Sequence, residues 1–432
     1  MLSMSGYTLM MIFDRVCLAA YSEETLAASG PAVFTAMILI SFFKGLIFAT
    51  QPKLVFAFEA RDGGQKLEEE VSRTIALALI SSLLLGILAP VLVIFSTFSG
   101  RPDPILEIES IYIHWSIAFG AVMILNTVGT CYFSATGKTK EVLKINSAGQ
   151  VVSMFMTWVL VFGELGFPEL GVTGSALGTL AGAFLILVLY VKSMSAGFFA
   201  MFIKTLKSYV RWPQFQIGKS LRYGAPVGAN ESADELGNTA IMWAIGLMGQ
   251  ISLAANSFNI ILNYFSVVPI VGLGEGANVL TARAIANDKH RQVPLIMWTT
   301  VGLALIYSIV IALLLRIFGE SLTVFLGVSD YGTEVFSLSL IITDVIFLYA
   351  FAFSLSYTAC RVLQAYGLNR FVLTTRLIIM WGMSIPAAFL IAISNSFEGH
   401  KLLTIWVSLS LFELMIGVVA SIRAVSLSRR FQ

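Results

Sequence analysis

An acidic cluster inside an otherwise apolar stretch is the part of the sequence best suited to chemistry. Glu231, Asp234 and Glu235 lie within the segment Tyr223–Met248, and Asn238 continues their spacing. Positions separated by three, four and seven residues share one face of an α-helix, so all four side chains can point the same way. Carboxylates on such a face can exchange protons, bind a small cation or hold a positively charged ligand.

The depth of this cluster argues against a lipid-facing position. Arg222 marks a water-facing end, so Asp234 lies roughly 18 Å along the helix, near the middle of a ~30 Å hydrocarbon layer. A charged side chain there costs roughly 2.5–3.5 kcal/mol. We therefore expect the cluster to face the protein interior or a water-filled cleft and to have a functional role there, as part of a substrate-binding face. The alternative is a structural role, with the carboxylates tied to neighbouring helices.

Other acids lie inside apolar segments at separate places along the chain. Asp14 interrupts the first such segment, Glu275 lies in a glycine-rich one, and Asp344 lies in LIITDVIFLYAF. We expect Asp14 to serve in ion coupling and the other two to line the substrate cleft, because charges at membrane depth mark such pathways. A satisfied structural carboxylate is the alternative for each, and it fits Glu413 in the last apolar segment best.

Lys44 is the one lysine placed deep in an apolar segment, SFFKGLIFA. We expect it in the substrate cleft, and its long side chain makes it the best basic partner for Asp14. An ammonium group tethered at Asp14 would take the place of a free coupling cation. The variant Lys44→Ala should then change the response to sodium or protons.

Several kinds of chemistry are excluded by what the sequence lacks. There is no nucleophile elbow, phosphate-cradling loop or zinc-protease motif. The three histidines are scattered and the three cysteines lie in or beside apolar runs, so we expect no metal site. We expect neither an enzyme nor a cofactor other than a coupling proton or sodium ion. We also expect no nucleic-acid partner, because the basic residues lie in short loops.

The elements that carry these residues are membrane-spanning helices. Charged residues make up 12% of the chain and hydrophobic residues 57%, whereas soluble proteins contain about 25% charged residues. Long unalternated apolar runs such as Thr74–Phe98 exclude a β-barrel. We predict an all-α polytopic membrane protein with about twelve transmembrane helices, at 3–20, 31–58, 72–98, 110–134, 142–163, 170–192, 220–247, 253–286, 293–317, 333–362, 371–394 and 402–424.

The distribution of basic residues predicts the orientation of these helices. Lysines and arginines gather in alternate loops, and the opposite loops hold only Arg101, Arg316 and Lys401. Because cytoplasmic loops carry the excess of positive charge, both termini are expected in the cytoplasm, with the protein in the inner membrane. The longest loop mixes aromatic and basic residues, which is typical of an amphipathic segment on the inner leaflet.

Internal repeats divide the chain into two halves. LAAS at 26–29 returns as LAAN at 253–256, and ATGKTK at 135–140 returns as AYGLNR at 365–370, with offsets of 227 and 230. We predict an N-terminal six-helix lobe at 1–195, a cytoplasmic linker at 196–217 and a C-terminal six-helix lobe at 218–432. Parallel repeats imply pseudo-two-fold symmetry about the membrane normal, with the substrate site between the lobes.

Four segments share a pattern that extends over nearly the whole chain. They are FDRVCLAAYSEETLAASG at 13–30, YFSATGKTKEVLKINSAGQ at 132–150 leading into VLVFGELGFPELGVTGSALGT at 159–179, GAPVGANESADELG at 224–237, and QAYGLNRF at 364–371. Together they resemble the multidrug and toxic compound extrusion (MATE) family of cation-coupled exporters. That family belongs to the wider multidrug/oligosaccharidyl-lipid/polysaccharide flippase superfamily.

The resemblance implies particular site residues. Asp14 matches the carboxylate that couples ions in the N-terminal lobe of many members, and the other ligands of that site match Ser153, Thr157 and Thr179. The sequence departs from the family at Ser153 and Thr157, where an asparagine and an aspartate are expected. The seventh-span acid of the family matches Asp234, with Glu235 next to it, so the resemblance implies a role in ion coupling for these two residues as well.

We therefore predict a secondary exporter that expels amphiphilic, cationic molecules in exchange for protons or sodium, acting as a monomer in the lipid bilayer by alternating access. The first alternative is a flippase for lipid-linked saccharides on the same scaffold, although such flippases line the cleft with basic residues and here the acids dominate. A membrane receptor or scaffold is a further alternative, but it does not require intramembrane acids in both halves. An intramembrane enzyme is disfavoured because Asp344 has no partner motif.

Overall fold

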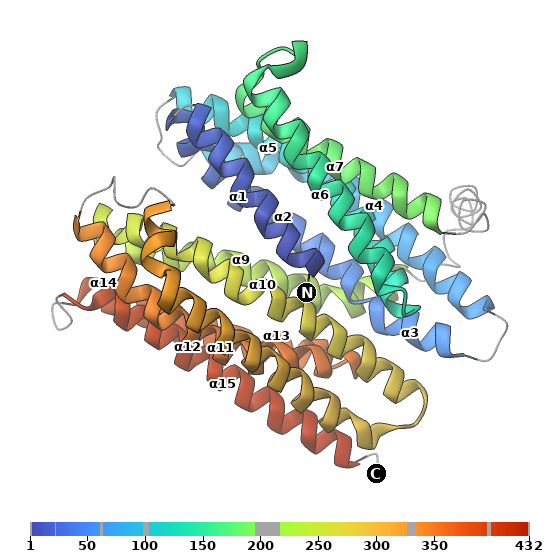
Figure 1. Cartoon of the computed structure of the whole chain (residues 1–432). Helices are drawn as coiled ribbons and strands as arrows, with labels where there is room; N and C mark the ends of the chain where they lie inside the picture. The colour runs from blue at the N-terminus through green and yellow to red at the C-terminus, as the bar shows by residue number, and fades with distance from the viewer. Residues whose placement is uncertain are drawn as a thin grey trace. The chain divides into compact units, whose positions relative to one another are not determined.

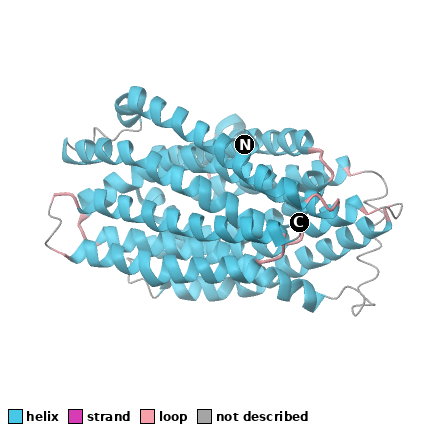
Figure 2. Cartoon of the chain, turned by 90° about the horizontal axis from the view of Figure 1, so that it is seen from below, coloured by secondary structure: helices cyan, strands magenta, loops and turns pink. Residues whose placement is uncertain are grey.

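The protein is almost entirely helical. The computed structural model describes residues 2–21, 23–60, 64–97, 103–194, 217–325, 333–394 and 399–430. Within these ranges the chain forms helices and connecting turns, with no β-strand (Figure 1, Figure 2). The predicted all-α fold is therefore confirmed.

Each predicted span coincides with one helix or with a short series of helices. In the first part of the chain these are α1 (Leu2–Tyr21), α2 (Glu23–Phe48), α3 (Gln51–Glu59), α4 (Gln65–Thr97), α5 (Asp103–Ala135), α6 (Thr139–Phe162) and α7 (Gly171–Ser193). In the second part they are α9 (Ile217–Gly246), α10 (Gln250–Ala286), α11 (Val293–Phe325), α12 (Thr333–Ala365), α13 (Asn369–Arg376), a π-helix (Leu377–Ser384), α14 (Ile385–Ile393) and α15 (Lys401–Arg430).

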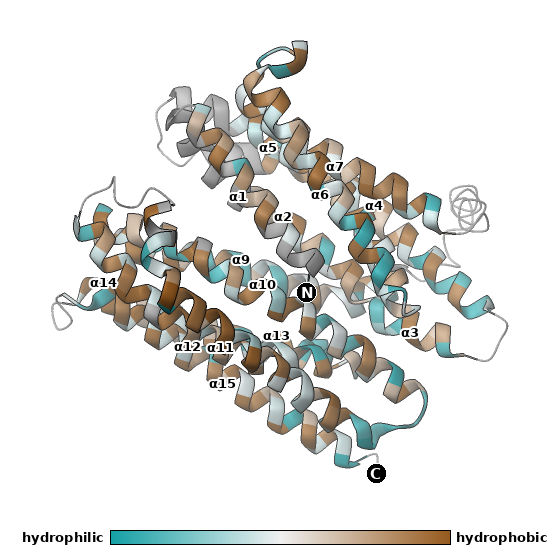
Figure 3. Ribbon diagram, viewed as in Figure 1, coloured by the Kyte–Doolittle hydropathy of each residue, from teal (hydrophilic) through white to brown (hydrophobic). Residues whose placement is uncertain are grey.

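Apolar length makes most of these helices suitable for a bilayer. Ten helical segments of the described chain are long and apolar enough to cross a membrane. The helices at the predicted first and seventh spans, α1 and α9, fall outside this set, and α9 carries the acidic cluster. Apolar residues run along most of the helices (Figure 3). On α11 the side chains of Leu295, Ile306 and Ile317 are more than 60% exposed, which suits contact with lipid because hydrocarbon offers no hydrogen bonds.

Two of the predicted spans are interrupted. The second span ends at Phe48, turns, and continues as α3, where Pro52 lies in the first helical turn. The hydroxyl of Thr50 donates to the carbonyl of Ile47 at 2.7 Å inside this turn. Proline lacks an N–H group and favours the start of a helix, which explains why a new helix begins here. The eleventh span is built from α13, the π-helix and α14 in succession.

The second sequence repeat returns in the structure as the same backbone turn. After α5, Gly137 has a φ of 79° and the amide of Lys138 donates to the carbonyl of Phe133 at 2.8 Å. After α12, Gly367 has a φ of 78° and the amide of Leu368 donates to the carbonyl of Leu363 at 3.1 Å. Glycine adopts this left-handed conformation without strain, so the same residue ends the helix in both halves.

The chain divides into two compact units. One comprises Gly6–Glu235 with Leu2, and the other comprises Leu236–Gln432 with Met1 and Ser3–Ser5. The division falls inside α9, whose first half belongs to the first unit. The domain limits at 195 and 218 stay a prediction, and residues 196–216 of the predicted linker lie outside the described residues.

A buried apolar core joins the helices of the second unit. It contains Ala244 of α9, Leu262 of α10, Ile342 of α12, Ala388 of α14 and Ile405 of α15, all almost completely buried. Packing of this kind fixes the helices that carry the charged residues of this unit.

Candidate functional site

Asp14 of α1 lies among hydroxyl groups from three other helices of the first unit. Ser175 on α7 donates to Asp14 Oδ1 at 2.7 Å, and Thr157 on α6 donates to the same oxygen at 3.4 Å. Tyr112 on α5 donates to Asp14 Oδ2 at 3.4 Å. An ionised carboxylate only accepts hydrogen bonds, whereas a hydroxyl can also accept. The same oxygens can therefore surround a proton or a small cation.

Close packing of α6 against α7 brings Thr157 and Ser175 together. Gly174, Gly178 and Gly182 recur at every fourth position of α7 and lie against α6. A Cβ atom at Gly178 would lie 2.4 Å from the backbone nitrogen of Thr157. Small residues allow such close approach of helix backbones in membranes, so the glycines determine where the two hydroxyls lie.

Ser153 and Thr179 lie one helical turn from the residues that reach Asp14. Ser153 is buried beside Gly182, and its hydroxyl has no hydrogen-bond partner among the described residues. Thr179 donates to the carbonyl of Ser175 at 3.1 Å. The role of these two residues in ion coupling stays a prediction.

Ser175 and Tyr112 were missed by the sequence reasoning. Ser175 lies four residues before Thr179, so helical spacing places both hydroxyls on one face of α7 and could have indicated Ser175. Tyr112 is one of thirteen tyrosines and stands in no motif. Only the packing of α5 against its neighbours brings it to Asp14.

The first half of α9 packs against α2 through small residues. A Cβ atom at Gly45 of α2 would lie 2.8 Å from Gly228 Cα and 3.0 Å from Glu231 Cγ. On the same half of α9, the hydroxyl of Ser232 donates to the carbonyl of Ile38 at 2.6 Å. These contacts bring the acidic cluster of α9 beside α2 within the first unit.

Glu235 makes polar contacts with α2. The hydroxyl of Ser41 donates to its carboxylate, and Lys44 on the next turn of α2 interacts with it electrostatically. Asp234 and Glu231 add two more negative charges nearby. The arrangement can hold a cation or a cationic ligand, because three carboxylates lie near one another and one ammonium group acts on Glu235.

The structure also gives the positions of Lys44 and Asn238, which were both expected in the substrate cleft. Lys44 was expected beside Asp14, but the structure places its ammonium 5.8 Å from the ring centroid of Phe48 and within electrostatic reach of Glu235. Asn238 is exposed and belongs to the second unit. The acidic face of α9 is thus divided between the two units after Glu235.

Glu275 forms a buried ion pair in the second unit. Arg361 Nη2 lies 3.0 Å from Glu275 Oε1, and the hydroxyl of Tyr357 donates to the same oxygen at 3.0 Å. The positive charge of Arg361 balances the carboxylate of Glu275, which agrees with the structural alternative for this residue. The expected place of Glu275 in a substrate cleft stays a prediction. Asp344 lies on α12, and its side chain lies outside the described residues.

Glu413 makes a second buried ion pair in this unit. Arg376 Nη1 lies 3.0 Å from Glu413 Oε1, and the hydroxyl of Ser356 donates to the same oxygen. Both charged side chains are at most 10% exposed. The pair joins α12, α13 and α15, as the structural interpretation of Glu413 implies.

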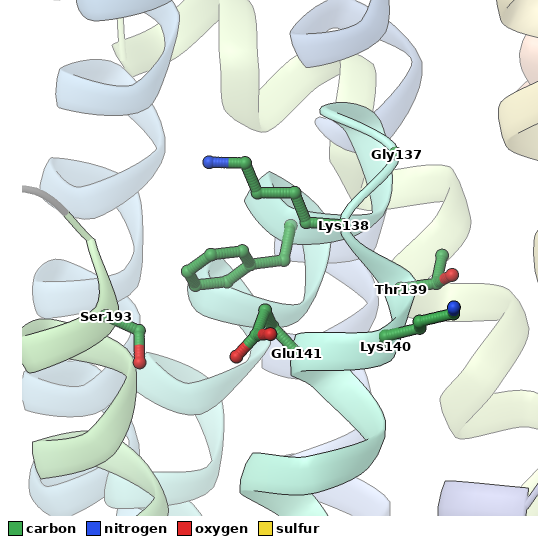
Figure 4. A pocket seen from close by; sticks show the side chains of 7 residues that line it. Gly137, Lys138, Thr139, Lys140, Glu141 and Ser193 are labelled. Carbon is green, nitrogen blue, oxygen red and sulfur yellow. The ribbon is translucent and has the colours of Figure 1, made fainter.

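A cavity of about 610 Å³ lies at the turn between α5 and α6 (Figure 4). Its lining consists of Phe133, Gly137, Lys138, Thr139, Lys140, Glu141 and Ser193. None of the predicted site residues belongs to it. Among the described residues, no group of three or more histidine, cysteine, aspartate or glutamate side chains could hold a metal ion.

Comparison with known proteins gives one consistent result. The MatE family model matches residues 1–159 and 228–390. The probable multidrug resistance protein YoeA of Bacillus subtilis is 23% identical over 354 residues, which cover 80% of this chain and 74% of YoeA. A probable multidrug resistance protein NorM of Photorhabdus laumondii is 24% identical over 401 residues, which cover 90% of this chain and 84% of that protein.

Solved structures agree on the fold. An outward-facing multidrug resistance MATE family transporter aligns with a TM-score of 0.87 at 15% identity, covering 100% of this chain and 94% of that one. A MOP superfamily transporter from Pyrococcus furiosus aligns with a TM-score of 0.86 over the same shares, also at 15% identity. The helical membrane fold, the family model and the curated relatives lead to one conclusion: the chain belongs to the MatE family, the multidrug and toxic compound extrusion transporters.

Proposed function

We propose that the protein is a secondary active exporter that expels amphiphilic, cationic compounds in exchange for protons or sodium by alternating access. The observation that carries the proposal is the carboxylate of Asp14, which accepts hydrogen bonds from the hydroxyls of Ser175, Thr157 and Tyr112. Membership of a transporter family and relatives that bear the name of multidrug resistance proteins support it.

Asp14 supplies the coupling step. A proton or sodium ion that binds there removes a negative charge from the membrane interior, where such a charge costs roughly 2.5–3.5 kcal/mol. Two helix arrangements that hold the charged and neutral carboxylate differently then change in relative population. Energy stored in the ion gradient thereby drives the change of access.

The acids of α9 supply cation recognition. Glu231, Asp234 and Glu235 lie together beside α2, and negative charge in a site of low dielectric constant attracts organic cations strongly. The same carboxylates disfavour an anionic cargo such as a lipid-linked pyrophosphate. We propose that the protein acts as a monomer in the cytoplasmic membrane. The alternation of basic loops supports an orientation with both termini in the cytoplasm.

The test is transport by purified protein in liposomes. Export of a cationic dye is followed under an imposed pH gradient and, separately, under an imposed sodium gradient. Wild type is compared with Asp14→Asn, Asp234→Asn and the control Glu164→Gln, because Glu164 is exposed in the loop after α6. We expect one gradient to drive export, Asp14→Asn to abolish it, and the control to behave as wild type.

The same experiment can also contradict the exporter proposal. If neither gradient moves dye and both aspartate variants match wild type, the acids are structural and the exporter proposal is wrong. A lipid-linked cargo then becomes the next candidate for transport.

A further inference from the structure

Lys44 lies on the side of α2 that packs against the acidic cluster. Ser41, three residues earlier, donates a hydrogen bond to Glu235, and Gly45, the next residue, packs against Gly228 and Glu231 of α9. Residues three and four apart share a helix face, so Lys44 belongs to the α9-facing side. Its ammonium interacts electrostatically with Glu235.

The surroundings of Lys44 keep its charge near the cluster. The side chain is half-buried, and the ammonium stands 5.8 Å from the ring centroid of Phe48. Attraction to the face of an aromatic ring adds to the attraction of the carboxylates. With all four side chains ionised, the formal charge of Glu231, Asp234, Glu235 and Lys44 together is −2, whereas the three ionised carboxylates alone carry −3.

We propose that Lys44 is a built-in competitor of the cationic cargo at Glu235. This inference rests on the proposed export of cations. When no cargo is bound, the ammonium partly balances the carboxylates. An arriving organic cation must displace it, which weakens binding, and the ammonium returns to Glu235 as the cargo departs, which speeds release.

If Lys44 competes with the cargo, the affinity for a cation should depend on the charge of the side chain at position 44. Replacing Lys44 with a neutral residue should tighten binding of a monovalent organic cation about tenfold, the factor that corresponds to about 1.4 kcal/mol of lost competition. A neutral molecule of the same shape should bind equally well to both proteins. Release slows with the tighter binding, so the maximal rate of cation export should fall while the concentration for half-maximal rate also falls.

The experiment measures equilibrium binding to the purified full-length protein. The probes are tetraphenylphosphonium as the cation and triphenylphosphine oxide as the neutral analogue. The variants are Lys44→Gln, Lys44→Met and Lys44→Arg, with Lys53→Gln as the matched control. Lys53 also contacts α9, over the ring of Tyr223 at 4.1 Å from its centroid, but Tyr223 lies roughly 18 Å along the helix from Glu235.

We expect both neutral Lys44 variants to bind the cation about tenfold more tightly, and Lys44→Arg and Lys53→Gln to stay within about twofold of wild type. In a Glu235→Gln background the gain from Lys44→Gln should disappear, because the competition is for that carboxylate. The monodisperse elution of each variant in size-exclusion chromatography shows that it is folded, and two neutral residues of different shape separate charge from packing.

Three results would overturn the inference. One is unchanged or weaker cation binding in both neutral variants, another is an equal gain in Lys53→Gln, and the third is an equal gain for the neutral probe. If wild type binds the cation and Glu235→Gln weakens binding while Lys44→Gln has no effect, the proposed function stands and only this inference fails. If neither wild type nor Lys44→Gln binds the cation, both proposals fail.

Discussion

At the scale of single residues, the acids inside the membrane differ in the kind of partner that the structure gives them. Asp14 accepts hydrogen bonds from hydroxyls of Ser175, Thr157 and Tyr112, whereas Glu275 and Glu413 face arginines. A guanidinium carries a permanent charge and balances a carboxylate without help. Hydroxyls solvate the carboxylate without carrying a charge, and a proton or small cation that binds among them would neutralise it.

Removal of one hydroxyl tests this arrangement. Ser175→Ala loses the 2.7 Å hydrogen bond to Asp14, and bonds to charged groups are worth about 1.5–3 kcal/mol. We expect ion-driven export in liposomes to fall about tenfold or more. Thr127→Ala is the control, because Thr127 on α5 donates only to its own helix, at the carbonyl of Met123. An equal loss in the control would contradict the assigned role.

Disruption of a buried ion pair should instead reduce stability. Glu413→Ala leaves Arg376 buried without its carboxylate, and breaking such a pair costs about 3–5 kcal/mol. We expect a lower midpoint of thermal unfolding in detergent. The double variant Arg376→Met/Glu413→Leu should recover most of the loss, because no charge stays buried. A midpoint equal to that of wild type for Glu413→Ala would show that the pair is not needed.

At the scale of elements, the contact between α6 and α7 determines the geometry around Asp14. Gly178 lies so close to Thr157 that any side chain would force the two backbones apart. By contrast, Gly86 of α4 has no heavy atom within 4 Å of an added Cβ. The two glycines thus separate the effect of close approach from the effect of helix propensity.

Gly178→Ala should therefore lower stability and ion-driven export, whereas Gly86→Ala should lower neither. Overpacking typically costs about 1–3 kcal/mol, and the shift also moves Thr157 away from Asp14. Gly86→Ala should leave stability unchanged or raise it, by up to about 1 kcal/mol. Thermal unfolding and ion-driven export of both variants check this. Equal behaviour of the two would show that α6 and α7 tolerate separation.

The elements themselves were largely predictable from sequence, because each depends on local apolar length and on glycine and proline. The positions of the spans and the turn at Gly137 are such features. The break between α2 and α3 was missed although Pro52 signals it, since the apolar run continues through it. Ser175 could have been found from its spacing to Thr179. The partners Tyr112 and Arg361 depend on contacts between distant helices, and no local pattern in one sequence encodes those.

At the scale of the whole molecule, the two compact units share a turn but differ in charge chemistry. Both halves end one helix with the same left-handed glycine, at Gly137 and Gly367. In the first unit Asp14 is surrounded by hydroxyls, while the second holds the two arginine-paired acids. The two units therefore share a helix-ending turn, while the partners described for their acids differ.

The proposed orientation of the whole chain can be tested with fusions. The alternation of basic loops predicts a cytoplasmic C-terminus and places the loop before Lys401 on the opposite side in the proposed topology. A fluorescent protein after Gln432 should fluoresce, and alkaline phosphatase inserted at His400 should be active. Alkaline phosphatase after Gln432 is the control and should be inactive. The reverse pattern would invert the predicted topology.

The glycine contact of α6 with α7 also has a mechanical consequence. The backbones of α6 and α7 touch along Gly174, Gly178 and Gly182. Neither helix can slide or tilt separately without a clash, so the two move as one rigid pair. Thr157 and Ser175 therefore keep their positions relative to each other within this helix pair. Any motion that opens or closes the group of hydroxyls around Asp14 must then come from α1 and α5, which makes these two helices the movable side of the proposed ion site.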